Sequence, residues 1–378
     1  MEKKRIATLM LGSILLSALS TGESYGQEKR MKDAYAGKFY IGTALNQGQI
    51  TGRDTASIRV VKENFSAIVA ENCMKIESIQ PQDGVFDFDL ADQFVEFGEK
   101  NGLFITGHTL MWHSQVPAWF FKDSQGNEVT REVLIERMKK HITTLVTRYK
   151  GRVKGWDVVN EAIEDDGSYR KSRFFKILGE DFIKLAFQFA HEADPSVELY
   201  YNDYSMANAG KRKGVVAMVK MLKDAGLRID AVGMQCHIGL DYPSLTEFEA
   251  SMEAFAAAGV KVMITEMDLT VLPTPNQRVG ADVSANFEYQ QKQNPYAKGL
   301  PDSVNVIFEK RYSDFFNLFL KHDEYVTRVT VWGVNDEMSW RNGWPVRGRT
   351  DYPLLFDRAN KPKPVVSKLI KLAANYSK

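Results

Sequence analysis

Short runs of apolar and β-branched residues alternate with longer amphipathic stretches along most of this chain. Eight runs have the length and composition of buried parallel strands, which are apolar on both faces. We predict one strand at each run: 39–45, 65–71, 103–109, 153–160, 197–202, 229–235, 260–266 and 327–332.

The stretches between these runs repeat apolar residues every three or four positions, as amphipathic helices do. In the stretch 130–150, for example, Leu134, Met138 and Ile142 follow this spacing. The same pattern predicts further helices at 89–101, 211–225 and 246–258. A glycine stands just beyond each of the four stretches, which is a common signal for the end of a helix.

Regular alternation of strands and helices, without a Pro/Ser-rich linker or a repeat of another period, predicts an α/β fold that is a single (β/α)8 TIM barrel. A doubly wound open sheet is the alternative, and it normally has a glycine-rich phosphate turn after its first strand. Here the first strand is followed by Asn46-Gln47-Gly48-Gln49, which lacks that pattern. We assign residues 28–378 to the barrel domain.

The N-terminal residues follow a different pattern. Lys3-Lys4-Arg5 precedes an apolar run at 6–19, and small and polar residues continue to Gln27. This order is typical of a secretory signal peptide, and the run is shorter than the roughly 20 apolar residues of a membrane span. We therefore expect residues 1–27 to be cleaved, the protein to be exported to the periplasm or the medium, and the mature chain to have no membrane span.

Charge, cysteines and histidines bear on whether the protein binds nucleic acid, forms a disulfide or holds a metal. The net charge is +1 over 378 residues, with no basic block, which argues against a nucleic-acid surface. Cys73 and Cys236 lie near the ends of separate predicted strands, where buried free thiols are the commoner state, although a disulfide stays open. His108 and His113 lack the spacing of a zinc-hydrolase motif. We predict no metal and no cofactor.

Polar and aromatic residues gather where the predicted strands end. In a TIM barrel these carboxyl ends form the active-site face, and they carry Glu71, Asn72, His108, Asn160, Glu161, Asn202, Asp203, Gln235, His237, Glu266 and Trp332. Any one of them could be an ordinary core residue, but the ensemble indicates a site. A glutamate at the end of a buried strand is costly without partners, and two such carboxyl groups are what glycoside cleavage requires.

Seven motifs, in order and at barrel-strand spacing, resemble those of family-10 glycoside hydrolases, the endo-1,4-β-xylanase family. They are ENCMK (71–75), GHTLMWHSQ (107–115), WDVVNE (156–161), YNDY (201–204), GMQCH (233–237), TEMDL (265–269) and WGV (332–334), followed by Trp340. The resemblance runs from about residue 39 to the C-terminus. Each motif alone is weak, but their order is specific.

The resemblance implies an endo-1,4-β-xylanase that cleaves xylan and xylo-oligosaccharides by a retaining double displacement. It assigns Glu161 as the general acid/base and Glu266 as the nucleophile, at the ends of the fourth and seventh strands. Two carboxyl groups on opposite sides of a barrel mouth can approach to the roughly 5–5.5 Å that direct attack requires. We expect a monomer.

The resemblance also implies roles for the neighbouring residues. Asn160 would bind the sugar 2-hydroxyl, His237 and Gln235 would face the nucleophile, and Asp268 would orient His237. The remaining residues would bind sugar hydroxyls on the non-reducing side (Glu71, Asn72, Lys75, His108), form aromatic walls (Trp112, Trp332, Trp340) or contribute to an aglycone subsite (Tyr204).

The chain departs from the family pattern in three places. Ile76 replaces a usual Trp, Met267 replaces a usual Leu, Ile or Tyr, and residues 272–300 form a long insertion that could add subsites, restrict them or cover the barrel rim. Two other functions stay open: a related barrel acting on glucan or mannan, and a catalytically silent carbohydrate-binding barrel. The motifs before Glu161 disfavour the first, and the presence of both glutamates disfavours the second.

Overall fold

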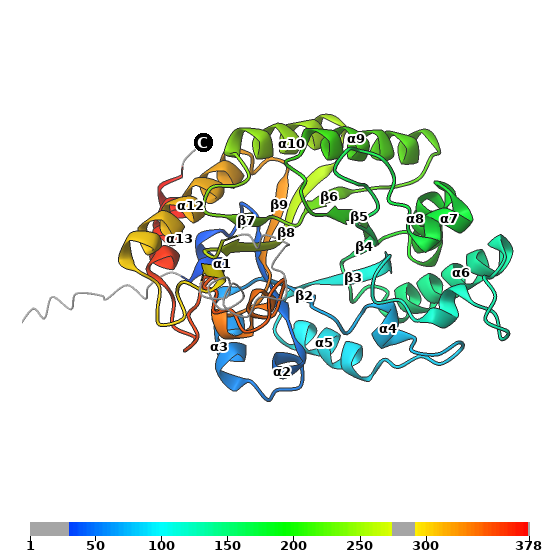
Figure 1. Ribbon diagram of the computed structural model, residues 1–378, viewed down its shortest axis with the longest axis horizontal. Coiled ribbons are helices and arrows are strands. Elements are labelled where there is room, and N and C mark those ends of the chain that lie inside the picture. The colour runs from blue at the N-terminus through cyan, green and yellow to red at the C-terminus, as the bar shows by residue number, and fades with distance from the viewer. Residues whose placement is uncertain (1–29, 274–291, 377–378) are drawn as a thin grey trace, which may run out of the picture.

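The computed structural model describes residues 30–273 and 292–376 (Figure 1). The predicted signal peptide at 1–27 lies outside the described residues, as does most of the predicted insertion at 272–300. In the two described ranges, none of the helices combines the length and the apolar character that crossing a membrane requires.

Parallel strands close into a barrel with helices around it, which confirms the predicted single TIM barrel (Figure 1). Along the barrel each strand pairs with its neighbour, and pairings β6–β8 and β1–β9 complete the ring. The barrel strands are β1 (Tyr40–Leu45), β2 (Ala67–Ala70), β3 (Phe104–Trp112), β4 (Gly155–Asn160), β5 (Glu198–Asp203), β6 (Ala231–Met234), β8 (Lys261–Thr270) and β9 (Val326–Val331).

A short additional strand, β7 (His237–Gly239), follows β6 after a break at Cys236, whose φ is +64°. It pairs with the last residues of β8, His237 opposite Asp268. For this reason β8 continues to Thr270, and the expected strand end at Glu266 is wrong: that glutamate lies inside the strand. The β3–β4, β4–β5 and β8–β9 pairs contain register shifts, and β8–β9 has one near the start of β8 and one next to Glu266. Irregularities of this kind commonly redirect side chains.

The four predicted helices are present, each within two residues of the expected bounds: α5 (Asp89–Lys100), α6 (Arg131–Arg148), α9 (Ala209–Asp224) and α10 (Leu245–Ala257). Other α-helices are α1 (Met31–Ala34), α2 (Gln47–Ile50), α3 (Thr55–Asn64), α4 (Ile76–Ile79), α7 (Arg173–Leu178), α8 (Asp181–Ala193), α12 (Asp302–Lys321) and α13 (Pro364–Asn375). Single 3-10 turns form at Ala118–Phe121, Asp336–Met338 and Trp340–Asn342.

Local sequence explains where these helices begin and end. The Thr130 hydroxyl accepts a hydrogen bond from the Val133 amide at the start of α6, and Ser244 caps α10 through the Glu247 amide. Each cap satisfies an amide that has no partner inside the helix. Gly151, with φ +75°, follows α6 in a left-handed conformation that side chains disfavour.

The barrel core places large and small residues against each other on adjacent strands. Trp156 on β4 is 1% exposed and lies opposite Gly107 on β3. A Cβ atom at Gly107 would lie 2.1 Å from the indole ring, so only glycine leaves room for it. Cys73 and Cys236 are buried free thiols, as expected.

Replacing Gly107 by alanine is therefore expected to displace Trp156 and lower the free energy of unfolding by about 1–3 kcal/mol, the usual cost of overpacking. Urea unfolding monitored by tryptophan fluorescence measures this. Gly343→Ala is the matched control, because its nearest neighbour would lie 3.7 Å from the new Cβ. Equal stability of the two variants would contradict this account of the core.

Candidate active site

A cleft of about 510 Å³ opens at the carboxyl ends of the barrel strands. Every residue to which the family resemblance assigned a role lines it, except Asp268, so the structure brings together residues that are far apart in sequence. Asn202 and Asp203, which were expected on the same face, do not line the cleft. The lining residues are Glu71, Asn72, Lys75, His108, Trp112, Gln115, Asn160, Glu161, Tyr204, Ser205, Gln235, His237, Tyr242, Glu266, Trp332, Trp340 and Arg341.

Glu161 directly follows β4 and has a left-handed backbone with φ +58°, which is unfavourable for a residue with a side chain. Its amide donates to the Asn202 carbonyl at 2.9 Å. The carboxylate oxygens accept from Trp112 Nε1 at 2.8 Å and from Gln235 Nε2 at 3.0 Å. These two hydrogen bonds fix the direction of the carboxyl group. The side chain is 13% exposed, so the carboxyl group can still be reached from the cleft.

Glu266 is almost fully buried at the base of the cleft. Its Oε1 accepts from Asn202 Nδ2 at 2.8 Å, and its Oε2 lies 3.2 Å from His237 Nε2. Thr265 Oγ1 donates to the Asn202 oxygen at 2.6 Å, which orients that amide with its nitrogen toward Glu266. Both carboxylate oxygens therefore have a donor.

Asn202 also donates to Asn160 Oδ1 at 3.0 Å, and Gln235 lies within 3.4 Å of the same oxygen. The oxygen of Asn160 is thus occupied on the protein side, so its amide nitrogen is left to donate into the cleft. The two glutamates are joined through this amide chain, Glu161 by Gln235 and Glu266 by Asn202.

Asp268 lies behind the cleft wall and organises three of the groups that line it. Its Oδ1 lies 3.0 Å from His237 Nδ1 and accepts from Arg341 Nε and Nη2 at 2.9 and 2.8 Å. Its Oδ2 accepts from Trp340 Nε1 at 2.7 Å. The predicted contact between Asp268 and His237 is therefore present, and Arg341 and Trp340 complete the arrangement.

These contacts determine the charges at neutral pH. Burial favours neutral His237, but Asp268 and Glu266 outweigh it and raise the pKa of His237 to about 9. Burial likewise opposes ionisation of Glu266, yet the hydrogen bond with His237 leads the interactions that hold its pKa below the ordinary value. The pKa of Asp268 is lowered strongly despite burial, mainly by the Arg341 guanidinium. Glu266 is therefore ionised beside a cationic His237.

A second polar group lies on the β2 side of the cleft. Lys75 Nζ donates to Asn72 Oδ1 at 3.0 Å and Gln115 Oε1 at 2.9 Å, and it lies 4.7 Å from the centre of the Trp112 ring. Burial is the main cause that raises the pKa of Glu71 and lowers the pKa of Lys75. This group offers hydrogen-bond donors and acceptors, from one acidic, one basic and two amide side chains.

His108 is held from behind by Asp157, with Nδ1 2.9 Å from Oδ2. This contact leaves the other ring nitrogen for the cleft that His108 lines. The Trp332 ring packs edge-on against His108 at a centroid distance of 5.5 Å.

The sequence assigned no role to four residues that line the cleft, nor to Asn202, which does not line it but donates to Glu266. The four are Gln115, Ser205, Tyr242 and Arg341. Gln115 and Asn202 fall inside the family motifs, so their positions were a usable signal. Ser205, Tyr242 and Arg341 lie outside those motifs and had no such signal. The departures from the family pattern, Ile76 and Met267, are buried and do not line the cleft.

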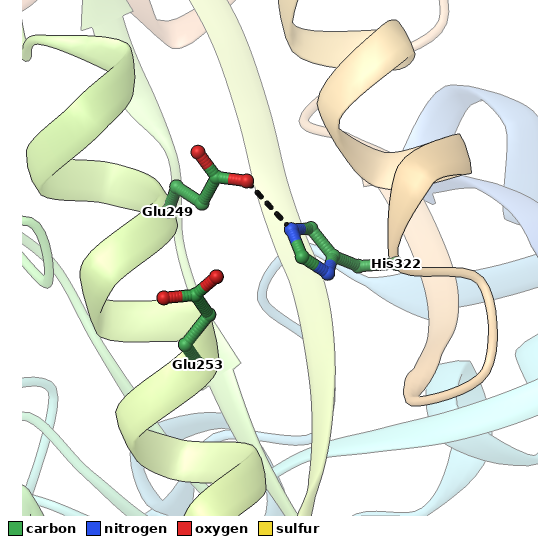
Figure 2. A group of neighbouring side chains, drawn as sticks. All are labelled: Glu249, Glu253 and His322. Carbon is green, nitrogen blue, oxygen red and sulfur yellow. Dashed lines mark hydrogen bonds and ion pairs between the residues drawn. The ribbon is translucent and has the colours of Figure 1, made fainter.

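Among the described residues, one group outside the cleft brings possible metal ligands together. Glu249 and Glu253 on α10 face His322, which follows α12, and their ligand atoms lie within 4.8 Å of one another (Figure 2). Lys321 Nζ and His322 Nε2 each lie 2.7 Å from Glu249 Oε1. Within the protein, Glu249 therefore already has Lys321 and His322 as partners.

Comparison with known proteins identifies the family of this chain. The model of glycosyl hydrolase family 10 matches residues 30–372. The chain belongs to this family. It is 51% identical to endo-1,4-beta-xylanase A of Xylanibacter ruminicola over 98% of this chain and 99% of that protein. It is 39% identical to the endo-1,4-beta-xylanase of Geobacillus stearothermophilus, over 90% of this chain and 98% of that one.

Solved structures of the family have the same fold. A GH10 endoxylanase retrieved from a sugarcane soil metagenome superposes with a TM-score of 0.86 at 45% identity, covering 91% of this chain and 99% of the other. Xylanase XynB from Paenibacillus barcinonensis, complexed with a conduramine derivative, gives a TM-score of 0.82 at 35% identity over 90% and 98% of the two chains. The predicted family-10 membership is thus confirmed.

The His237 site predicts a pH dependence of stability. The pKa of His237 rises from 6.5 to about 9 in the folded protein, so its protonation stabilises the fold fully below pH 6.5 and this contribution is lost as pH rises through 9. Between pH 6.5 and pH 9 the free energy of unfolding of the wild type should fall by up to a few kcal/mol, at about 1.4 kcal/mol per pKa unit. In His237→Gln it should change less over the same range. Urea unfolding at pH 6, 7.5 and 9.5 checks this; parallel profiles would contradict it.

Proposed function

We propose that this chain is an endo-1,4-β-xylanase that hydrolyses internal β-1,4-xylosidic bonds of xylan and xylo-oligosaccharides with retention of anomeric configuration. One observation carries the mechanism: a buried, ionised Glu266 and a cleft-facing Glu161 are linked by the Gln235–Asn160–Asn202 hydrogen bonds. The full-length relatives named as endo-1,4-beta-xylanases support the substrate.

In the first step, the Glu266 carboxylate attacks the anomeric carbon while Glu161 gives its proton to the glycosidic oxygen. The bond between that carbon and oxygen breaks, the shortened chain leaves as an alcohol, and a covalent glycosyl-enzyme ester remains. The free amide nitrogen of Asn160 donates to the sugar 2-hydroxyl, a bond that strengthens toward the transition state.

In the second step, Glu161 is ionised and removes a proton from water as the water attacks the anomeric carbon. The ester bond to Glu266 breaks, the sugar leaves with its original configuration, and both carboxyl groups return to their starting states. His237 stays paired with Asp268 throughout, so the charge beside Glu266 is balanced even while Glu266 is esterified.

The remaining cleft residues bind the polymer. We assign the group around Lys75, with Glu71, Asn72 and His108, to sugar hydroxyls on the non-reducing side. Apolar walls around the reactive sugar come from the indole rings of Trp112, Trp332 and Trp340. Tyr204 contributes to the leaving-group side.

Preference for pentose follows from the position of Trp340. Its Nε1 is held by Asp268, so the ring cannot easily swing away from the cleft. A hydroxymethyl group on C5 of the reactive sugar would crowd this ring, at a cost of about 1–3 kcal/mol. We also propose that the enzyme is exported through its N-terminal segment and acts as a monomer.

Glu266→Gln and Glu161→Gln are expected to reduce turnover of xylan by at least about 10²-fold, because each removes a group that takes part in bond cleavage or proton transfer. Reducing-sugar release from xylan measures this, and Glu136→Gln, exposed on α6, is the matched control. NMR of a xylo-oligosaccharide digest should show the β-anomer first. Initial formation of the α-anomer would contradict the double displacement.

A mechanism-based xylosyl inactivator should label Glu266, and peptide mass spectrometry identifies the modified residue. Absence of any label, with no hydrolysis of xylan, would instead favour a silent carbohydrate-binding barrel.

Turnover of xylan is expected to exceed that of carboxymethylcellulose by about 10-fold or more, since 1.4 kcal/mol corresponds to a factor of ten. Reducing-sugar assays on both polymers at equal concentration make the comparison. Equal rates, or faster cleavage of a glucan or mannan, would contradict the xylan assignment.

A further inference from the structure

The loop after β4 folds back so that its far end returns to Glu161. Ile163 and Tyr169 form an isolated antiparallel bridge, and the Arg170 amide donates to the Ala162 carbonyl at 2.8 Å. The loop therefore places the Arg170 side chain directly behind the acid/base candidate.

The guanidinium group of Arg170 contacts three different partners. Its Nε donates to the main-chain carbonyl of Glu161 at 2.7 Å, its Nη2 donates to the Tyr204 hydroxyl, and its Nη1 lies 3.3 Å from a Glu164 carboxylate oxygen. The side chain is 18% exposed, so these contacts are largely shielded from water. Hydrogen bonds from a charged donor are roughly twice as strong as neutral ones.

The peptide that joins Glu161 to Ala162 is held at both of its polar atoms. Arg170 binds the carbonyl, and the Tyr201 hydroxyl accepts from the Ala162 amide at 3.0 Å. Fixing this peptide plane sets ψ of Glu161, while the bond from the Glu161 amide to Asn202 restrains φ. The backbone of Glu161 is left-handed, with φ +58°. Loss of one restraint would therefore allow it to relax to a conformation of lower energy.

The second partner of Arg170 belongs to the leaving-group side of the cleft. Tyr204 lines the cleft, and its ring lies over the ammonium of Lys211 at 3.9 Å. Lys211 is fully buried and donates to Asp203 at 3.0 Å. Tyr204 is thus rigidly backed, and Arg170 connects this fixed ring to the Glu161 main chain.

We propose that Arg170 is a positioning residue that directs the Glu161 carboxyl group toward the leaving oxygen and holds it in register with Tyr204. This inference rests on the proposed retaining mechanism. Glu266 is held by a separate set of contacts, Asn202 and His237. Loss of Arg170 therefore impairs proton transfer and leaves nucleophilic attack largely intact.

Aryl β-xylobiosides that differ in the pKa of the phenol test the proposal. Arg170→Met should lower kcat/KM by about 10- to 100-fold for poor leaving groups, which need the proton, and only slightly for dinitrophenol, which leaves without it. Arg170→Lys, which keeps the charge but not the forked geometry, should lie between Arg170→Met and wild type. Azide, a nucleophile that needs no base, should restore kcat of Arg170→Met on the activated substrate.

Arg173→Met is the matched control, because Arg173 is exposed at the start of α7, three positions further along. Thermal unfolding of all variants shows whether the barrel is intact. An equal loss of kcat/KM for every leaving group, without azide rescue, would overturn the positioning role and indicate a merely structural one. Absence of wild-type activity on any xylobioside would instead overturn the proposed function itself.

Discussion

A buried negative charge at the mouth of the barrel is the constraint on which the site depends. Glu266 needs its charge for nucleophilic attack, and burial of an isolated carboxylate is strongly unfavourable. His237 and Asn202 compensate for that charge, and Asp268 in turn compensates for His237. Arg341 then balances Asp268. A single catalytic requirement thus accounts for a chain of alternating charges that reaches from the cleft base into the loop after β9.

The barrel meets this requirement through its strand geometry. The chain breaks at Cys236 after β6 and then forms the short strand β7. The first residue of β7, His237, pairs with Asp268 on β8. Because residues two apart on a strand point to the same side, Glu266 and Asp268 can both reach the one imidazole. The histidine therefore contacts a carboxylate with each ring nitrogen, which explains why it stays protonated well above its ordinary range.

The two glutamates are held in different ways, and this difference matches their tasks. Glu266 lies within a strand, with both oxygens engaged and almost no exposure, as suits a group that must arrive at one carbon. Glu161 lies at a strand-to-loop transition, more exposed, with a strained backbone supported by Arg170 and Tyr201. A group that gives and takes protons in successive steps needs access to both the leaving oxygen and water.

Local signals in the chain were enough to predict the barrel, its order of strands and the residues at the strand ends, and the resemblance to family-10 glycoside hydrolases implied the rest of the predicted cleft. Periodicity, caps and terminal glycines act over a few residues, and the carboxyl ends of parallel strands necessarily meet on one face, so the amino-acid pattern alone places Glu161, Glu266 and His237 together. The folded chain was needed to show that Asp268 lies behind the cleft, that β8 runs past Glu266, and that Arg170 and Arg341 support the site. These features depend on how β7 and the loops return to the barrel, which the local pattern of apolar and polar residues does not specify.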